Sequence, residues 1–268
     1  MDNNRTMYKA FNLTDIDYSK FNGLGGSESH CLRTQDFDGE IKAFFEDGGF
    51  DGSGIQQDWF PKVHADIFIS HAHKDMDQAT GLANWLFDNF GLTSFIDSQV
   101  WGHADKLIKK LNDHYKEPDS KNYSYEATKK TSSHVHVMLS TALSKMIDAC
   151  ECVFFMNTPN SLSASQIDEK TFSPWIFYEV TTVNLIRKKK PKEHRLKGKN
   201  FSEARIRESL PQISVRYNLD VSSQMVKLTG QDLADWKVCA AYSVTFRRAP
   251  EKTHPLDKLY KKKGIPLC

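Results

Sequence analysis

The stretch Ala65-Asp66-Ile67-Phe68-Ile69-Ser70 decides the fold class of this chain. A short, nearly continuous apolar run of this kind is typical of a parallel β-strand that helices cover on both faces. The segment that follows, from Asp75 to Phe90, repeats large apolar residues at every fourth position and therefore predicts an amphipathic helix. Gly91 is the residue type that commonly ends such a helix. A strand followed by a helix is the first unit of an α/β fold.

The same alternation of strand and helix continues along the chain. Apolar runs predict two further strands, at 93–97 and 152–156. Amphipathic patterns predict helices at 104–115, 135–149 and 174–186. Between these elements, the polar residues 116–133 predict an insertion or a long loop. This rhythm predicts an α/β fold whose parallel sheet is joined by right-handed crossovers.

Beyond residue 187 the pattern is weaker. It predicts short helices and strands at 202–210, 212–217, 225–228 and 231–241. The basic run at 187–199 has no interleaved aromatic residues, so we interpret it as a solvated loop, with nucleic-acid binding as a minor alternative.

Composition excludes several classes of protein. The 268 residues are 39% hydrophobic and 26% charged, which excludes collagen-like, coiled-coil and wholly disordered chains. The net charge of +2 gives no global attraction to nucleic acid or to an anionic membrane. We expect no membrane-spanning helix and no signal peptide, because no apolar run is long enough and the first residues are polar. Five scattered cysteines suggest free thiols and hence a cytoplasmic location.

The chain divides into three predicted parts. Residues 1–61 contain two glycine-rich patches and more acidic than basic residues, which predicts an N-terminal flank or a small subdomain. Residues 62–245 carry the strand–helix alternation and predict the main domain. Residues 246–268 include a run of three lysines and predict a loose C-terminal extension or tail.

Candidate site residues lie where the predicted strands end. In an open parallel sheet, ligands bind beyond the carboxyl ends of the strands. Ser70 and His71 follow the first predicted strand, and a segment from Asp97 to Asp105 follows the second. The third segment, Ser173-Pro174-Trp175, predicts a helix start, because serine is a good N-cap and proline suits the first helical position. Trp175 and Glu179 then share one helix face, where a ring beside a carboxylate can hold a flat heterocycle and its sugar.

Three of these segments resemble Toll/interleukin-1 receptor (TIR) domains. Residues 65–75 resemble the first sequence box of that family, and residues 95–102 resemble its second strand and the loop that follows. Ser173-Pro174-Trp175 with Glu179 matches the family's Trp-x-x-x-Glu helix. The order and the spacing agree over residues 62–186. The resemblance implies a flavodoxin-like fold, a parallel sheet with helices on both faces.

The resemblance also implies an activity. Enzymatic TIR domains cleave the nicotinamide–ribose bond of NAD+, and the helix glutamate, here Glu179, is the catalytic residue. Ser70, His71 and Trp175 would line the substrate pocket. Trp101 would close over it from a mobile loop, within one protomer or from a neighbour. Asp97 is a further candidate for substrate contact, and a brace for the loop is its other interpretation.

Partners follow from the same resemblance. NAD+ would be the substrate and not a bound cofactor, and TIR–TIR self-association would be needed for activity. The product would be ADP-ribose or a cyclic ADP-ribose signal, and many bacterial relatives act in antiphage defence. A cyclic product would reach a separate effector protein.

Two other functions stay open at this point. The chain could be a non-catalytic TIR adaptor that works through self-association, or a nucleoside glycosyl-transferring enzyme on a related sheet. A metal site is not expected, because the histidine and cysteine pairs lack further ligands at zinc-like spacing. These pairs are His71 with His73, His134 with His136, and Cys150 with Cys152.

Overall fold

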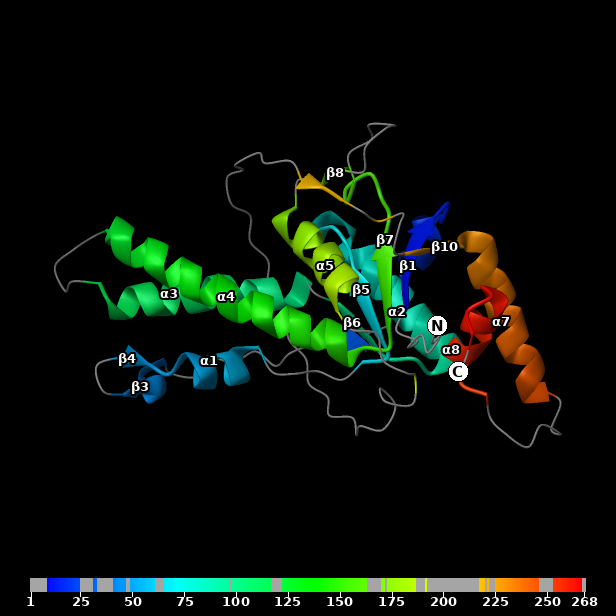
Figure 1. Cartoon of the computed structure of the whole chain (residues 1–268), viewed down its shortest axis with the longest axis horizontal. Helices are drawn as coiled ribbons and strands as arrows, with labels where there is room; N and C mark the ends of the chain where they lie inside the picture. The colour runs from blue at the N-terminus through cyan, green and yellow to red at the C-terminus, as the bar shows by residue number, and fades with distance from the viewer. Residues whose placement is uncertain are drawn as a thin grey trace, which may run out of the picture.

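A six-stranded parallel sheet lies at the centre of the molecule (Figure 1). The computed structural model describes residues 9–24, 31–32, 41–46, 49–60, 65–96, 98–116, 122–162, 170–171, 173–186, 191, 217–219, 221, 225–245 and 253–266. The strand order is β10-β1-β7-β5-β6-β2, and every neighbouring pair is parallel. The strands are β1 (Lys9–Thr14), β2 (Cys31–Leu32), β5 (Ile67–Ser70), β6 (Ser94–Ile96), β7 (Cys152–Met156) and β10 (Val226–Thr229).

Helices cover both faces of this sheet, which confirms the predicted α/β fold class. One face carries α2 (Met76–Phe90), α7 (Gly230–Thr245) and α8 (Pro255–Lys262). The other face carries α1 (Gly52–Trp59), α3 (Ser98–His114), α4 (Tyr125–Ala149) and α5 (Pro174–Leu185). Short elements complete the described chain: β3 (Phe45–Glu46), β4 (Gly49–Phe50), β8 (Lys170–Thr171), β9 (Tyr217–Asn218), and the 3-10 helices η1 (Tyr18–Phe21), η2 (Ile41–Phe44) and η3 (His73–Asp75).

The core has two halves, one on each face of the sheet. Alternate residues of a strand point to opposite faces, so each central strand supplies both halves. In β7, Phe154 belongs to the half beneath α2, α7 and α8, whereas Val153 and Phe155 belong to the half beneath α3, α4 and α5. All five residues of β7 are buried. This two-sided burial explains why the strand is apolar without interruption.

The helix boundaries follow local sequence signals. Gly91 ends α2 in the left-handed conformation, with φ 68°, as predicted. Within α2, a Cβ atom on Gly81 would lie 1.9 Å from the carbonyl oxygen of Phe21. Only glycine therefore allows η1 to approach α2 this closely.

The N-terminal strand β1 is part of the central sheet, so the predicted boundary at residue 61 is wrong. β1 lies between β7 and β10, with Phe11 paired to Phe154 on one side and to Val226 on the other. Phe11 and Leu13 are fully buried. The strand mixes polar and apolar residues with neither strict alternation nor a continuous apolar run, and its partners are distant along the chain. For these reasons the sequence does not single it out.

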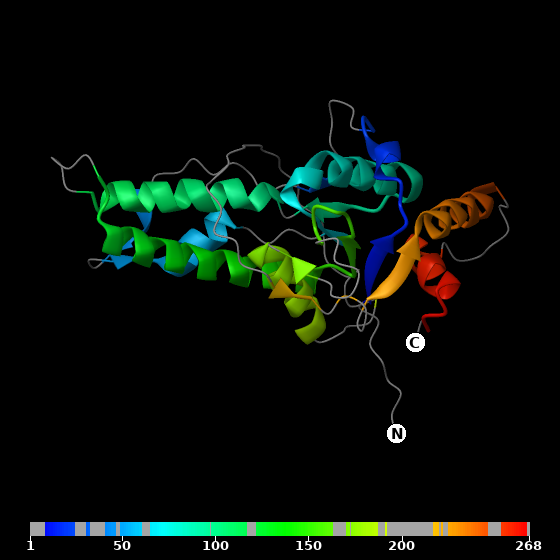
Figure 2. The same ribbon diagram turned by 90° about the horizontal axis from the view of Figure 1, so that it is seen from above.

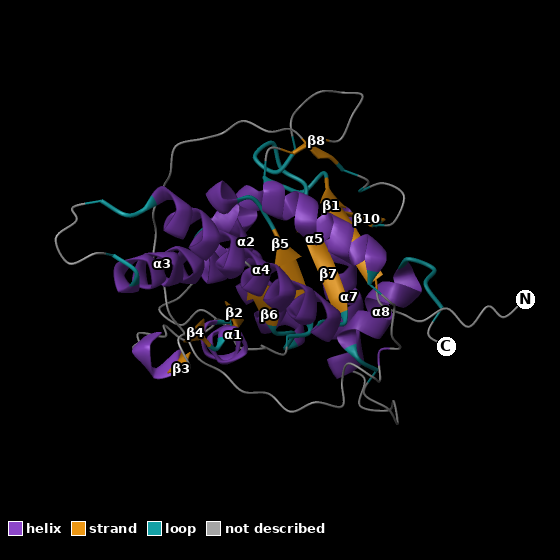
Figure 3. Ribbon diagram, turned by 60° about the vertical axis from the view of Figure 1, so that its left-hand side comes forward, coloured by secondary structure: helices purple, strands orange, loops and turns teal. Residues whose placement is uncertain are grey.

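The helices α3 and α4 form a hairpin that extends away from the sheet (Figure 2). Residues 125–133 belong to α4, so the predicted loop at 116–133 is wrong over that part. Ser124 caps the helix, and Thr131 and Val135 are buried on its inner side. The other positions of residues 125–133 are exposed or only partly buried, which explains the polar sequence. Figure 3 shows α1, β3 and β4 beside this hairpin, so part of the N-terminal flank packs there.

The C-terminal helix α8 is packed on the sheet, and the prediction of a loose tail is wrong. Leu256, Leu259 and Tyr260 are fully buried, at the spacing of one helix face. The indole nitrogen Nε1 of Trp236 donates a 2.9 Å hydrogen bond to the carbonyl of Pro255. Lys263 also forms a 3.0 Å ion pair with Asp232 of α7. Because lysines lie beside these apolar residues along the chain, the apolar face of the helix is not obvious from the sequence.

Two further sequence expectations concern cysteines and membranes. Cys150 and Cys152 are buried free thiols, as predicted, and burial raises the pKa of the Cys152 thiol. In the part of the chain that the structure describes, no helix has both the length and the apolar character needed to cross a membrane. The predicted helix at 202–210 and the basic run at 187–199 lie outside the described residues, apart from position 191.

Candidate functional site

The candidate site lies at the carboxyl end of β5, where the strand order reverses. From β5 the chain passes through α2 to β6 on one side, and from β6 it returns through α3 and α4 to β7 on the other side. In doubly wound sheets, ligands bind outside the strand ends at such a reversal. Ser70 is the last residue of β5 and is paired with Phe155 of β7. Topology therefore places Ser70 at the edge that the sequence predicted.

Glu179 of α5 meets Ser70 at this edge. The Ser173 hydroxyl accepts a 3.3 Å hydrogen bond from the Ile176 amide, and Pro174 occupies the first turn. This cap fixes where α5 begins, so that Glu179 in the second turn faces the sheet. The Ser70 hydroxyl donates a 2.6 Å hydrogen bond to Oε2 of Glu179. Ser70 is 2% exposed and Glu179 is 1% exposed, so this bond lies in the protein interior.

Trp175 lies one helical turn before Glu179 but contacts α4. Its ring is 5.8 Å from the ring of His136 and 6.4 Å from that of Tyr178, both at edge-on angles. The Tyr178 hydroxyl donates a 2.7 Å hydrogen bond to the Ser140 carbonyl, which fastens α5 to α4. The described contacts of Trp175 are therefore packing contacts within α5 and with α4. Because Trp175 and Glu179 are four residues apart, they also lie on the same side of α5.

The structure places the other predicted site residues, His71, Trp101 and Asp97, differently from one another. His71 follows Ser70 directly and is buried at the same edge. Trp101 lies in the first turn of α3, so its predicted position on a mobile loop is wrong. Helix α3 starts soon after β6 because a lone glycine, Gly102, does not interrupt a helix whose later apolar residues pack in the core. Asp97 lies outside the described residues.

A second buried polar cluster at this edge was missed by the sequence reasoning. The Thr158 hydroxyl and the Asn160 amide donate hydrogen bonds of 2.5 and 2.6 Å to the two carboxylate oxygens of Asp75. Burial raises the pKa of the nearby Tyr18 hydroxyl, and the negative charge of Asp75 raises it further. The signal in the sequence was the polar segment from Thr158 to Ser161, directly after a buried strand. Asp75 thus links the ends of β5 and β7.

The arrangement provides an oriented carboxylate in a water-poor setting. Such a group stabilises positive charge strongly, because little solvent screens it and its direction is already fixed. Within the described residues, no group of three or more histidine, cysteine, aspartate or glutamate side chains could hold a metal ion. At this edge, the Glu179 carboxylate could stabilise positive charge electrostatically.

Comparisons with protein-family models, with curated proteins and with solved structures find no match to this chain. The features that bear on function are therefore the geometry at the end of β5 and the resemblance of the three sequence segments.

Replacing Ser70 tests how firmly Glu179 is held. We expect Ser70→Ala to lower the free energy of unfolding by about 1–3 kcal/mol, because a buried carboxylate loses a hydrogen-bond donor. Urea denaturation would measure the change. The control is Ser133→Ala on the exposed side of α4, where we expect a change below about 0.5 kcal/mol. Equal urea midpoints for Ser70→Ala and the unmodified protein would contradict the expectation.

Proposed function

We propose that this protein is a TIR-type enzyme that cleaves the nicotinamide–ribose bond of NAD+. The observation that supports the proposal is the buried hydrogen bond between Ser70 and Glu179 at the point where the strand order reverses. Residues of two sequence segments separated by more than a hundred positions meet there. Both segments belong to the three that resemble the TIR family.

Cleavage of this bond needs little more than a carboxylate. The C–N bond breaks with its electron pair going to the nicotinamide nitrogen, which neutralises the positive charge of the ring. The ribose is left with oxocarbenium character, and the negative charge of Glu179 stabilises it. Nicotinamide departs as a neutral molecule, so a general acid is not required. One carboxylate is sufficient.

The acceptor decides the product. When water attacks the ribose carbon, its proton passes to solvent and ADP-ribose forms. When a nitrogen of adenine or a ribose hydroxyl of the same molecule attacks, a cyclic nucleotide forms. The first product implies NAD+ depletion and the second implies a signal for a separate effector. Both fit a cytoplasmic defence against phage, which we propose by analogy with bacterial TIR proteins.

Burial of Glu179 sets a condition on this proposal. At 1% exposure, the carboxylate reaches a substrate only after the side chains that cover it have moved. Binding of NAD+ or association of protomers must supply that rearrangement. This condition agrees with the dependence on self-association that the TIR resemblance implies.

Incubation of the purified protein with NAD+ tests the proposal. The assay is performed in dilute solution, at high protein concentration and with a crowding agent, because association is expected to favour turnover. Liquid chromatography then identifies nicotinamide and the second product, and it separates ADP-ribose from its cyclic isomers. Absence of nicotinamide above the buffer control in all three conditions would contradict the proposal.

A non-catalytic adaptor is the second candidate, and the burial of Glu179 favours it. In that case the carboxylate serves only to join α5 to β5 through Ser70. The protein would self-associate but release no nicotinamide in any assembled state. Trp101→Ala would then abolish association, as measured by sedimentation.

A further inference from the structure

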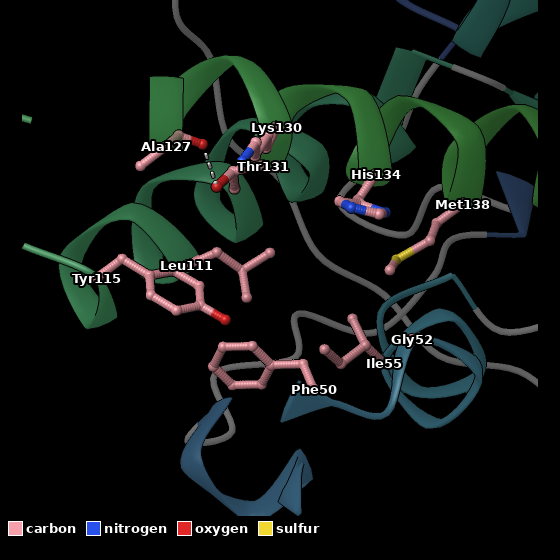
Figure 4. A pocket seen from close by; sticks show the side chains of 10 residues that line it. All are labelled: Phe50, Gly52, Ile55, Leu111, Tyr115, Ala127, Lys130, Thr131, His134 and Met138. Atoms are coloured by element: carbon pink, nitrogen blue, oxygen red, sulfur yellow. Dashed lines mark hydrogen bonds between the residues drawn. The ribbon is translucent and has the colours of Figure 1, made fainter. Parts of the chain in front are cut away.

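A cavity of about 430 Å³ lies on the helical hairpin, apart from the sheet edge that carries Glu179 (Figure 4). Its walls come from β4 and α1 on one side and from α3 and α4 on the other. The volume falls within the range of sites that bind small organic molecules. None of its lining residues takes part in the proposed NAD+ chemistry, so the cavity needs an explanation of its own.

Most of the cavity wall is apolar. Figure 4 shows five apolar or aromatic side chains that surround the space: Phe50, Ile55, Leu111, Tyr115 and Met138. The rings of Phe50 and Tyr115 meet edge-on, with centroids 5.9 Å apart. Aromatic and branched walls of this kind suit a flat apolar body, because stacking and dispersion act over its whole area.

The α4 side of the cavity carries two basic residue types, a lysine and a histidine. Lys130 and His134 line it and lie one helical turn apart. The ten lining residues that the structure describes include no aspartate or glutamate. Within the described part of the chain, Lys130 forms no ion pair. A ligand that occupied the cavity would gain from an anionic group directed at α4.

Hydrogen bonds within the protein fix the positions of the cavity walls without a ligand. The Gln56 side-chain amide on α1 donates a 2.7 Å hydrogen bond to the Met138 carbonyl on α4. Asp51 caps α1 by accepting a 2.9 Å hydrogen bond from the Ser53 amide. A site that exists before binding loses little affinity to rearrangement.

We propose that this cavity binds an amphipathic organic anion. The flat apolar part lies between Phe50, Leu111 and Met138, and the anionic group lies against Lys130 and His134. The proposal concerns a second site and does not depend on NAD+ cleavage.

Two matched fluorescent probes test the proposal without any nucleotide. Anilinonaphthalene sulfonate has an apolar body, a naphthalene joined through an amine to a phenyl ring, with one anionic group, and phenylnaphthylamine has the same body without the charge. We expect both to bind the full-length protein saturably, and the sulfonate to bind about five- to tenfold more tightly. Equal affinity for the two probes, or no saturable binding of the sulfonate, would overturn the proposal.

Charge reversal locates the anionic group. We expect Lys130→Glu to weaken sulfonate binding by about tenfold or more and to leave the binding of the neutral probe within about twofold. Lys129→Glu is the matched control, because Lys129 is the preceding exposed lysine of α4 and does not line the cavity. An equal loss of sulfonate affinity in both variants would overturn the assignment.

Filling the cavity locates the apolar part. We expect Met138→Trp to abolish binding of both probes, while Val137→Trp, on the neighbouring exposed position, leaves both affinities unchanged. Far-ultraviolet circular dichroism reports whether each variant is folded. If Met138→Trp does not fold, Ala127→Phe at the more exposed end of the cavity replaces it. Undiminished probe binding in the folded, filled variant would overturn the proposal.

Discussion

Glu179→Gln is expected to reduce nicotinamide release from NAD+ by at least about a hundredfold, the effect of removing one oriented group that stabilises transition-state charge. The substitution removes the negative charge but preserves the shape of the side chain. The amide oxygen of glutamine can still accept the hydrogen bond that the Ser70 hydroxyl donates to Oε2 at 2.6 Å. The variant therefore separates the charge from the packing. Initial rates would be compared in the condition that gives the fastest turnover of the unmodified protein.

A matched variant protects this comparison against nonspecific effects. Glu126→Gln changes the same residue type in the exposed first turn of α4, and we expect its rate to stay within about twofold. Urea denaturation of both variants shows whether they remain folded. A Glu179→Gln protein that is folded and still releases nicotinamide at the unmodified rate would rule out a catalytic role for this carboxylate. A protein inactive even before substitution would instead point to the adaptor.

Phe11→Ala is expected to lower the free energy of unfolding by about 3–5 kcal/mol, the usual cost of truncating a fully buried phenylalanine. Phe11 is 0% exposed. Its ring meets Phe154 edge-on at 5.8 Å and stacks on Tyr260 at 6.3 Å, so β1, β7 and α8 all lose contacts. A chain that begins at residue 62 lacks the whole strand, and we expect it not to fold.

Lys9→Ala provides the control on the same strand. Lys9 is half-buried at the start of β1, and we expect its substitution to change stability by less than about 0.5 kcal/mol. Thermal or urea unfolding, followed by circular dichroism, measures the stability of Phe11→Ala, of Lys9→Ala and of the chain that begins at residue 62. A cooperative unfolding transition in the chain that starts at residue 62 would contradict the placement of β1 in the core.

The elements that sequence analysis predicted well are those whose signals are local. The predicted strand at 152–156 has the same first and last residues as β7. Because this strand is buried on both faces, all five residues are apolar and the apolar run marks both of its ends. The cap at Ser173 likewise fixed the start of α5. The meeting of Ser70 with Glu179 followed from a rule of topology, since both were assigned to the carboxyl edge of one sheet.

The elements that were missed depend on distant partners. β1 and α8 look polar or mixed in sequence, and only their contacts with β7 and with each other show that they are buried. The first turns of α4 look like a loop because only one side of that helix is covered. Trp175 seemed to face a cleft, but its neighbour His136 comes from another helix that the sequence could not place beside it.

The position of β1 has a consequence for how the protein is made. The strand is synthesised before both of its neighbours in the sheet: β7 follows long after it along the chain, and β10 comes later still. Until β7 has been synthesised, the nascent chain therefore carries a strand whose core residues Phe11 and Leu13 lack the partners that bury them. Such an exposed segment invites aggregation and engages chaperones, so we expect folding to be completed after release of the finished polypeptide.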